Sequence, residues 1–400
     1  MPSVSRRCVM YVSGFDPKGA AHYHALYRDE AARKLAADTS TPRVSERRRL
    51  PGGNSFWSVQ TQDGEQVVHT HYEFMRWDDV VRRHWPRTTW ALWRAVISTT
   101  HFYVRHGALW KMFLLAWPPA VAAFTPFMLV CAMLLGVPLA ALTATWMALG
   151  LQWHPAGALV SGGAAGVAVW GLCSMLEKRF SMYWMMRSYA FTARQARGEL
   201  PDLEQRLDVL AQRLVERLKT QPDDEVLVVG HSSGAIMAAI IVARALQQAP
   251  RLLSGRTRLS LLTLGQWIPL LGLLPMAQGF RAELQTLGGA NGLTWVDFSA
   301  PPDGCCFALT HPLRSCCVSG GPATGADIKL LNPRFANLFH APAYAALKRD
   351  KLAMHFQYLR RADKAGDYDY FAITSGAQTL AERYAQTPSV DNYAGLKPLG

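Results

Sequence analysis

The stretch EVLVVGHSSGA at residues 225–235 combines two kinds of local sequence. The continuous apolar run VLVVG is typical of a strand buried in a parallel sheet, and the small residues of GAIMAAII that follow predict a helix. Between them, the pattern G-x-S-x-G sets Ser232 between Gly230 and Gly234. Such a turn holds its central serine in a strained conformation at a helix N-terminus. The stretch therefore predicts a nucleophilic serine, with a plain turn of small residues as the alternative.

The segments on both sides of this stretch alternate between strand and helix patterns. Short β-branched or apolar runs predict strands, and apolar residues at helical spacing predict helices. The expected strands are 8–15, a hairpin at 56–74 around Asp63-Gly64, 225–230, 258–265 and 293–299, with DIKLLN as a possible last strand, and the expected helices include 20–37, 201–219 and 234–248. This alternation predicts an α/β fold with a mostly parallel sheet and helices on both faces.

An apolar run interrupts this pattern before the serine. Residues 112–176 contain no Asp, Glu, Lys or Arg, and about 20 apolar residues suffice to cross a bilayer. Hydropathy favours two spans at 112–135 and 156–176, and small residues in the second suit close packing against the first. The linking segment 136–154 leaves a third span or a re-entrant piece open, and a buried helical pair in a soluble protein is a further alternative.

The apolar run divides the chain into three parts. We expect the first part of one domain at 1–111, a transmembrane hairpin at 112–176 and the second part of that domain at 177–400.

Composition excludes several functional classes. The net charge of +13 includes basic residues near both ends of the apolar run, which suits anionic lipid. The basic run SERRRL (45–50) is interpreted as a solvated loop, so no nucleic-acid partner is expected. The pairs Cys305-Cys306 and Cys316-Cys317 lack the spacing of a zinc site. Neither a phosphate-binding glycine loop nor an H-E-x-x-H helix is present, so neither a cofactor nor a metal is expected. The first residues, MPSVSRRCVMYVSGF, lack the apolar segment of a secretory signal.

Three motifs carry a resemblance to the α/β-hydrolase superfamily. They are VLVVGHSSGA, an early strand ending in GFDP, and the later WVDFSAPPD. In that superfamily the nucleophile is followed in chain order by the acid and then the histidine. The resemblance favours Asp303 as the acid, because it lies in a loop just beyond a strand; Asp297, within the strand, is the alternative.

The same chain order leaves three candidates for the histidine. His355 is favoured because its apolar and aromatic neighbours suit an imidazole with a tuned pKa. His340 is the main alternative, and His311 follows the acid by only eight residues.

The resemblance implies a role for each residue. Ser232 attacks an acyl carbonyl, His355 transfers the proton, and Asp303 orients the imidazole. The backbone N–H groups of Ser233 and Phe15 form the oxyanion hole. The expected protein is a membrane-anchored serine hydrolase that cleaves an ester or thioester of a lipid-like acyl substrate. A non-catalytic scaffold of the same fold and an acyltransferase with the same triad are the alternatives, and the apolar stretch 264–280 is interpreted as a lid, a pocket wall or a buried connection.

One site built from Phe15 and Ser232 constrains the topology. Both residues must lie on the same side of the membrane, so the number of spans is even, which favours two. Basic residues flank the outer ends of the apolar run, and the positive-inside rule then places the hydrolase domain in the cytoplasm. Unpaired cysteines agree with a reducing compartment. We expect a protein of the bacterial inner membrane whose partners are the lipid bilayer and the acyl substrate.

Overall fold

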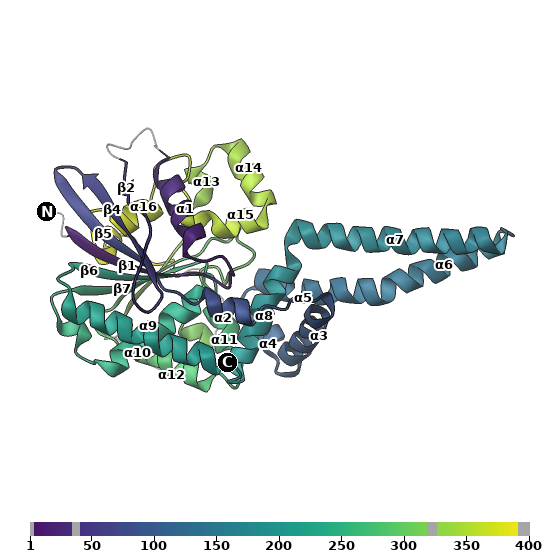
Figure 1. Ribbon diagram of the computed structural model, residues 1–400, viewed down its shortest axis with the longest axis horizontal. Coiled ribbons are helices and arrows are strands. Elements are labelled where there is room, and N and C mark those ends of the chain that lie inside the picture. The colour runs from purple at the N-terminus through teal and green to yellow at the C-terminus, as the bar shows by residue number, and fades with distance from the viewer. Residues whose placement is uncertain (1–3, 34–40, 318–325, 391–400) are drawn as a thin grey trace.

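The computed structural model describes residues 4–33, 41–317 and 326–390, and its fold is α/β with one mostly parallel mixed sheet (Figure 1). In the described part of the chain, the strands lie in the order β2-β4-β5-β1-β6-β7-β8-β9, and β3 pairs with β4. The strands are β1 (Arg6–Val12), β2 (Arg43–Val44), β3 (Arg48–Arg49), β4 (Ser55–Asp63), β5 (Gln66–Phe74), β6 (Glu225–His231), β7 (Arg258–Leu264), β8 (Thr294–Phe298) and β9 (Asp327–Leu331). Strands β5, β1 and β6–β9 run parallel, whereas β2, β3 and β5 pair antiparallel with β4.

Both ends of the chain contribute to this one sheet. Strand β1 lies between β5 and β6, and Tyr11 is in register with Phe74 on one side and Val229 on the other. Segments on either side of the apolar run are therefore hydrogen bonded to each other. Because these strands are parallel, their carboxyl ends meet at one edge of the sheet, where ligand sites of open α/β sheets lie.

Helices cover both faces of the sheet, as the buried face of each amphipathic helix requires. Helix α9 (Pro201–Thr220) buries Leu203, Leu207 and Leu214 at helical spacing, and it packs with α10 (Gly234–Gln248) and α12 (Gln278–Gly288) on one face. The other face carries α1 (Ala20–Ala31) and the late helices α13 (Phe335–Leu338), α14 (Ala341–Arg349), α15 (Lys351–Phe356), α16 (Tyr370–Ser375) and α17 (Leu380–Arg383). The α/β prediction and its main strands are confirmed.

A long helical pair projects away from the sheet (Figure 1). Helix α5 (Trp117–Cys131), a π-helical turn (Ala132–Gly136) and α6 (Val137–Gly150) form one 34-residue helix, and α7 (Pro155–Phe180) forms the second, of 26 residues. Both are long and apolar enough to cross a membrane, and only 17% of the most apolar window of each is buried. Two further helices, α3 (Thr89–Arg105) and α4 (Ala108–Leu115), lead into the pair, and α8 (Met182–Ala196) leads out of it.

The predicted bounds of the first span are wrong, although the number of helices is right. The expected linker 136–154 is helical as far as Gly150, and the reversal occupies only residues 151–154. A proline in a helix removes one N–H donor and crowds the carbonyl four residues earlier. Here the π-helical turn ends at Gly136, two residues before Pro138, and such a widened turn is a recognised way to accommodate the ring. The helix therefore continues where a break was expected.

Three smaller expectations are also refined. Strand β1 ends at Val12 rather than at Phe15, and α1 ends at Ala31, while residues 34–37 of the predicted helix lie outside the described part. The stretch 264–280 contains α11 (Ile268–Gly272), whose residues are all buried in the core. The stretch is buried as far as Leu274, as expected of a buried connection, and the role of a lid or pocket wall stays a prediction.

Small residues bring the two long helices close together. A Cβ added at Gly162 would lie 2.0 Å from Thr145 Oγ1 and 2.6 Å from the Ala141 carbonyl oxygen. Gly166, one turn later, faces Val137 and Ala141. In a membrane there is no hydrophobic driving force between helices, and close van der Waals packing of this kind is what stabilises a helix pair. The adjacent Gly163 faces open space instead.

This contrast predicts opposite effects of two neighbouring substitutions. Gly162→Ala should lower the free energy of unfolding by about 1–3 kcal/mol, because the new methyl group overlaps α6. Gly163→Ala should be neutral or raise it by up to about 1 kcal/mol through helix propensity. Thermal unfolding of the two variants in the same detergent measures the difference, and equal melting temperatures would contradict the packing described here.

Candidate active site

Ser232 lies in a turn whose geometry its neighbours enforce. Its φ is +59°, in the left-handed region that non-glycine residues rarely adopt, and its N–H donates to the Leu264 carbonyl of β7 at 2.9 Å. A Cβ at Gly230 would lie 2.6 Å from Ala235 Cα, and one at Gly234 would lie 2.4 Å from the Ser13 carbonyl oxygen. Only glycines allow β6, the turn and α10 to pack this closely. The turn sets Ser232 at the carboxyl edge of the sheet.

The loop after β1 lies against this turn. A Cβ at Gly14 would be 3.1 Å from Ser232 Cβ and 3.5 Å from its Oγ. The next residue, Phe15, donates its backbone N–H to the side-chain Oγ of Ser233 at 2.8 Å. The structure thus brings together the two expected oxyanion donors, but the Phe15 N–H already has a partner. The Ser233 N–H belongs to the start of α10, where backbone donors have no partner within the helix.

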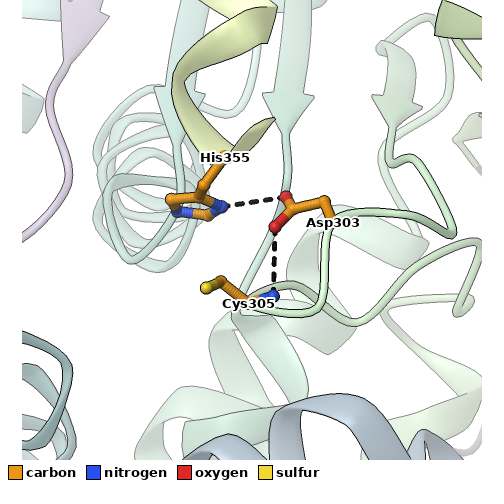
Figure 2. Close-up of side chains that lie close together, drawn as sticks. All are labelled: Asp303, Cys305 and His355. Atoms are coloured by element: carbon orange, nitrogen blue, oxygen red, sulfur yellow. Dashed lines mark hydrogen bonds and ion pairs between the residues drawn. The ribbon is translucent and has the colours of Figure 1, made fainter. Parts of the chain in front are cut away.

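Asp303 and His355 form a buried hydrogen-bonded pair (Figure 2). His355 Nδ1 lies 2.8 Å from Asp303 Oδ2, and both side chains are fully buried. The Cys305 N–H donates to Asp303 Oδ1 at 3.0 Å, and the Tyr358 hydroxyl donates to Oδ2 at 3.1 Å. Burial alone would raise the pKa of Asp303, but the His355 imidazole, the Cys305 N–H and the Cys306 side chain outweigh it and hold the pKa below its usual value. The carboxylate is thus stabilised in its charged form.

The second ring nitrogen of His355 is directed away from Asp303 (Figure 2). This Nε2 atom is buried and has no hydrogen-bond partner among the described residues. The ring lies 5.0 Å, centroid to centroid, from that of His231, the residue directly before Ser232. No hydrogen bond joins Ser232 to His355 among the interactions described, and hydrogen bonds of this kind are often long before a substrate binds. A buried acceptor nitrogen without a hydrogen-bond partner lowers the stability of the folded protein. A role in proton transfer would explain why such an atom is retained.

The alternative candidates, Asp297, His340 and His311, lie outside the Asp303–His355 pair, and each has different surroundings. Asp297, in β8, accepts hydrogen bonds from Thr263 at 2.6 Å and Ser299 at 2.8 Å, and burial raises its pKa to about 7. His340 is exposed at the N-terminus of α14. His311 Nδ1 accepts backbone N–H groups of the turn that follows it. The hydrogen bond to His355 is made by Asp303, the favoured acid.

The sequence did not predict the positioning contacts of two residues, His231 and Tyr358, although Tyr358 was noted as an aromatic neighbour of His355. His231 Nε2 donates to the His355 carbonyl oxygen at 2.8 Å, which links the backbone of His355 to the end of β6. Tyr358, in a 3₁₀ turn (Gln357–Leu359) after α15, supports Asp303 and accepts the Ala300 N–H at 2.8 Å. Their positions, beside the serine and three residues after the histidine, were the only available signals.

The same residues bear on the question of a metal. The ligand atoms of Asp303, Cys305 and His355 lie within 4.8 Å of one another. However, burial raises the pKa of the Cys305 thiol far above its usual value, which disfavours the thiolate that binds metal. Both carboxylate oxygens of Asp303 accept hydrogen bonds, and His355 Nδ1 is engaged with one of them. The donor set suits an acid–histidine pair better than a metal centre.

Comparisons with family models, curated proteins and solved structures found no match to this chain. The geometry of the site is therefore the basis for the function proposed below.

The buried His231 predicts a specific pH dependence of stability. Burial, and then the neighbouring His355, lowers its pKa from 6.5 to about 3. Between these values the unfolded chain binds one more proton than the folded one, so stability falls as the pH drops below 6.5. From pH 7 to pH 5 the loss from this group is about 2 kcal/mol.

His231→Gln removes this titration and keeps an N–H donor for the His355 carbonyl. Thermal unfolding of both proteins at pH 7 and pH 5 in detergent should show a smaller decrease for the variant. The account of His231 fails if the two proteins lose the same stability over this range.

Proposed function

We propose that this protein is a membrane-anchored serine hydrolase that cleaves an ester or thioester of a lipid-like acyl substrate. The observation that carries the proposal is the fully buried Asp303–His355 pair at the sheet edge where Ser232 is held at positive φ. A strained serine and a buried acid–histidine pair on three separate segments constitute the parts of a nucleophilic triad.

Each group has one task in the proposed reaction. Ser232 Oγ attacks the acyl carbonyl while His355 Nε2 accepts its proton, and the proton then passes to the leaving group. The charged Asp303 stabilises the imidazolium through the Nδ1 hydrogen bond. Water, activated by the same histidine, releases the acyl group from the serine. The oxyanion is stabilised by the Ser233 N–H, and by the Phe15 N–H once the Ser233 hydroxyl has moved away.

The topology supports the resemblance to the α/β-hydrolase superfamily. The proposed nucleophile, acid and histidine follow one another along the chain at 232, 303 and 355, the order expected of that superfamily. The acid lies in the loop after β8, and the strand carrying the Phe15 turn is the direct neighbour of the nucleophile strand. The helical pair is then an insertion between the early strands and the nucleophile strand of a hydrolase domain.

The bases of both long helices lie against the proposed site. Pro118, at the start of α5, has its Cβ 3.8 Å from the Cβ position of Gly304, the residue after the acid. Arg179, near the end of α7, donates to the Arg349 carbonyl at 2.6 Å, just before the helix that carries His355. A site built against the ends of membrane helices lies next to the lipid surface, which favours a substrate that resides there.

Aromatic side chains of α8 pack against residues that neighbour the site. Phe191 lies 4.8 Å from Phe15, and Tyr189 lies 5.0 Å from Trp267, both measured between ring centroids. Ser232 itself is only 3% exposed. Because the surroundings are apolar and aromatic, an acyl chain suits them better than a polar substrate does.

With an even number of spans both parts of the domain lie on one side of the membrane, and the charges at the helix ends favour one side. Arg105 and Lys111 precede the first long helix, and Lys178 and Arg179 end the second, whereas the turn between the helices has no basic residue. These charges favour a cytoplasmic hydrolase domain in a bacterial inner membrane.

Two observations favour a second candidate, a non-catalytic scaffold with the same fold. The Phe15 N–H is occupied by Ser233 Oγ, and the serine makes no hydrogen bond to the histidine among the described contacts. A closed resting state accounts for the same features. Transfer of the acyl group to an acceptor other than water would use the same residues.

Covalent labelling and esterase kinetics test the proposal together. A fluorophosphonate should label detergent-solubilised wild type and fail to label Ser232→Ala, and labelling of His355→Ala should collapse. Asp303→Asn should lower kcat for a short acyl ester by about 10⁴-fold, since a neutral partner favours the wrong imidazole tautomer. Asp297→Asn is the matched control, and we expect its kcat to stay within about fivefold of wild type because Asp297 does not contact the histidine.

The absence of labelling in folded wild type would favour the scaffold. A large loss in Asp297→Asn together with an unaffected Asp303→Asn would refute the assignment of the acid.

The topology is tested with single cysteines and a membrane-impermeant maleimide. Gln152→Cys, introduced in a Cys317→Ser background, places a thiol in the turn between the long helices. It should react in intact spheroplasts, whereas the exposed native Cys317 should react only after permeabilisation. Equal reactivity of both positions in intact spheroplasts would contradict the proposed orientation.

A further inference from the structure

A cavity lined by arginines lies outside the proposed catalytic site. It has a volume of about 230 Å³ and contains side chains from four segments of the first part of the chain. Its lining includes Gly19, Arg47, Arg49, Ser55, Arg76 and Arg82. Drug-sized ligands occupy about 300–1,000 Å³, so this cavity suits one small group of a larger molecule.

Strand register brings the arginines together. Arg49 is paired with Ser55, and Ser55 with Phe74, which forms one row across β3, β4 and β5. Alternation along an extended segment places Arg47 and Arg49 on the same side and Arg48 on the other. Arg47 donates to Ser55 Oγ at 3.2 Å, which fixes it over the same row.

The cavity carries an excess of positive charge. Arg82 is paired with Asp78 at 2.5 Å, and this is the closest acid–base contact at the cavity. Arg76 has only a 3.9 Å contact with Asp79, and Asp79 also binds Arg206 at 2.9 Å. Arg47 and Arg49 have no acidic partner among the described residues. The guanidinium groups of Arg47, Arg49 and Arg76 are thus left, in the described part of the chain, without a carboxylate closer than 3.9 Å.

The end of a helix also borders the cavity, but it already faces a carboxylate. Helix α1 begins directly after Gly19, and a Cβ at Gly19 would lie 3.0 Å from Asp78 Oδ2, which belongs to another lining residue. The excess positive charge of the cavity therefore comes from the arginines. Guanidinium forks match the tetrahedral oxygens of phosphate with paired hydrogen bonds.

We propose that this cavity binds the phosphate group of a phosphate ester. The loop that begins the cavity at Gly19 is the same one that places Phe15 beside Ser233. Strands β5, β4 and β3 lie two, three and four strands from β6, so the cavity is roughly 10–20 Å from the strand that precedes Ser232. Phosphate binding in this cavity does not depend on a reaction at Ser232. That the bound phosphate is part of the acyl substrate rests on the proposed function.

Calorimetry on the full-length protein tests the site. The Ser232→Ala variant in neutral detergent is titrated with glycerol 3-phosphate, with glycerol, and with dihexanoyl phosphatidylglycerol. Phosphate esters should bind and glycerol should not. Arg49→Gln and Arg76→Gln should each weaken binding at least about tenfold, the effect of losing one charge-assisted contact.

Arg48→Gln is the matched control, because it removes the same charge one residue away on the opposite side of the strand. We expect its affinity to stay within about twofold of the parent protein, as for a charge that makes no direct contact. Tighter binding of the short-chain lipid than of glycerol 3-phosphate would identify a lipid headgroup as the source of the phosphate, and the reverse order would identify a soluble phosphate ester.

Two results would overturn the site: no binding of any phosphate ester, or the same loss of affinity in Arg48→Gln as in Arg49→Gln. Phosphate binding in a protein that fluorophosphonate does not label would leave the anion site standing and remove the hydrolase. Fluorophosphonate labelling without phosphate binding would support the hydrolase and remove the anion site.

Discussion

Close packing of β6 and α10 against β1 is the constraint on which the site depends. Gly230 and Gly234 have no space for a Cβ, because backbone atoms lie 2.4–2.6 Å from the positions a Cβ would take. The chain can reverse direction between them only if Ser232 adopts a positive φ, which costs about 1–2 kcal/mol for a residue with a side chain. The remaining fold compensates for this strain through a sheet that is buried on both faces. The strained residue is Ser232 itself, so the turn fixes the orientation of the Ser232 hydroxyl group.

The same edge of the sheet collects the other parts of the site. Gly265, just after β7, has a φ of +53°, and a Cβ there would lie 2.8 Å from the Tyr358 ring and 3.2 Å from Asp303 Oδ2. The loop after β7 must therefore pass close to the acid and its tyrosine. His231 links the end of β6 to the His355 backbone. Glycines and buried polar contacts, rather than the proposed catalytic residues alone, hold these segments together.

The sequence was most informative where one local pattern is sufficient. The buried strand β6 and the helix α10 could be predicted because an apolar run, two glycines and a small-residue helix all indicate the same structure. Asp303 and His355 were favoured from chain order and local setting, and the structure places them 2.8 Å apart. The helical hairpin was recognised by its lack of charge, but not the position of its turn, since a π-helical widening absorbs Pro138. The partners of Phe15, His231 and Tyr358 could not be predicted, because each contact joins segments more than fifty residues apart.

Contacts at the bases of the long helices connect the proposed chemistry with the proposed location. Gly304, next to Asp303, lies close to Pro118 of the first long helix, and Arg349, just before α15, accepts a hydrogen bond from Arg179 of the second. Under the proposed function, the state with Ser232 buried and the Phe15 N–H bound by Ser233 Oγ is interpreted as a resting form.

The most direct measurement is an experimental structure of the full-length protein in lipid nanodiscs after reaction with an alkyl fluorophosphonate. The account predicts a covalent bond from phosphorus to Ser232 Oγ, with a phosphoryl oxygen within hydrogen-bond distance of the Phe15 and Ser233 N–H groups and with Ser233 Oγ displaced. A phosphonate bound to another residue, or an adduct on Ser232 with the Phe15 N–H still donating to Ser233 Oγ, would contradict it.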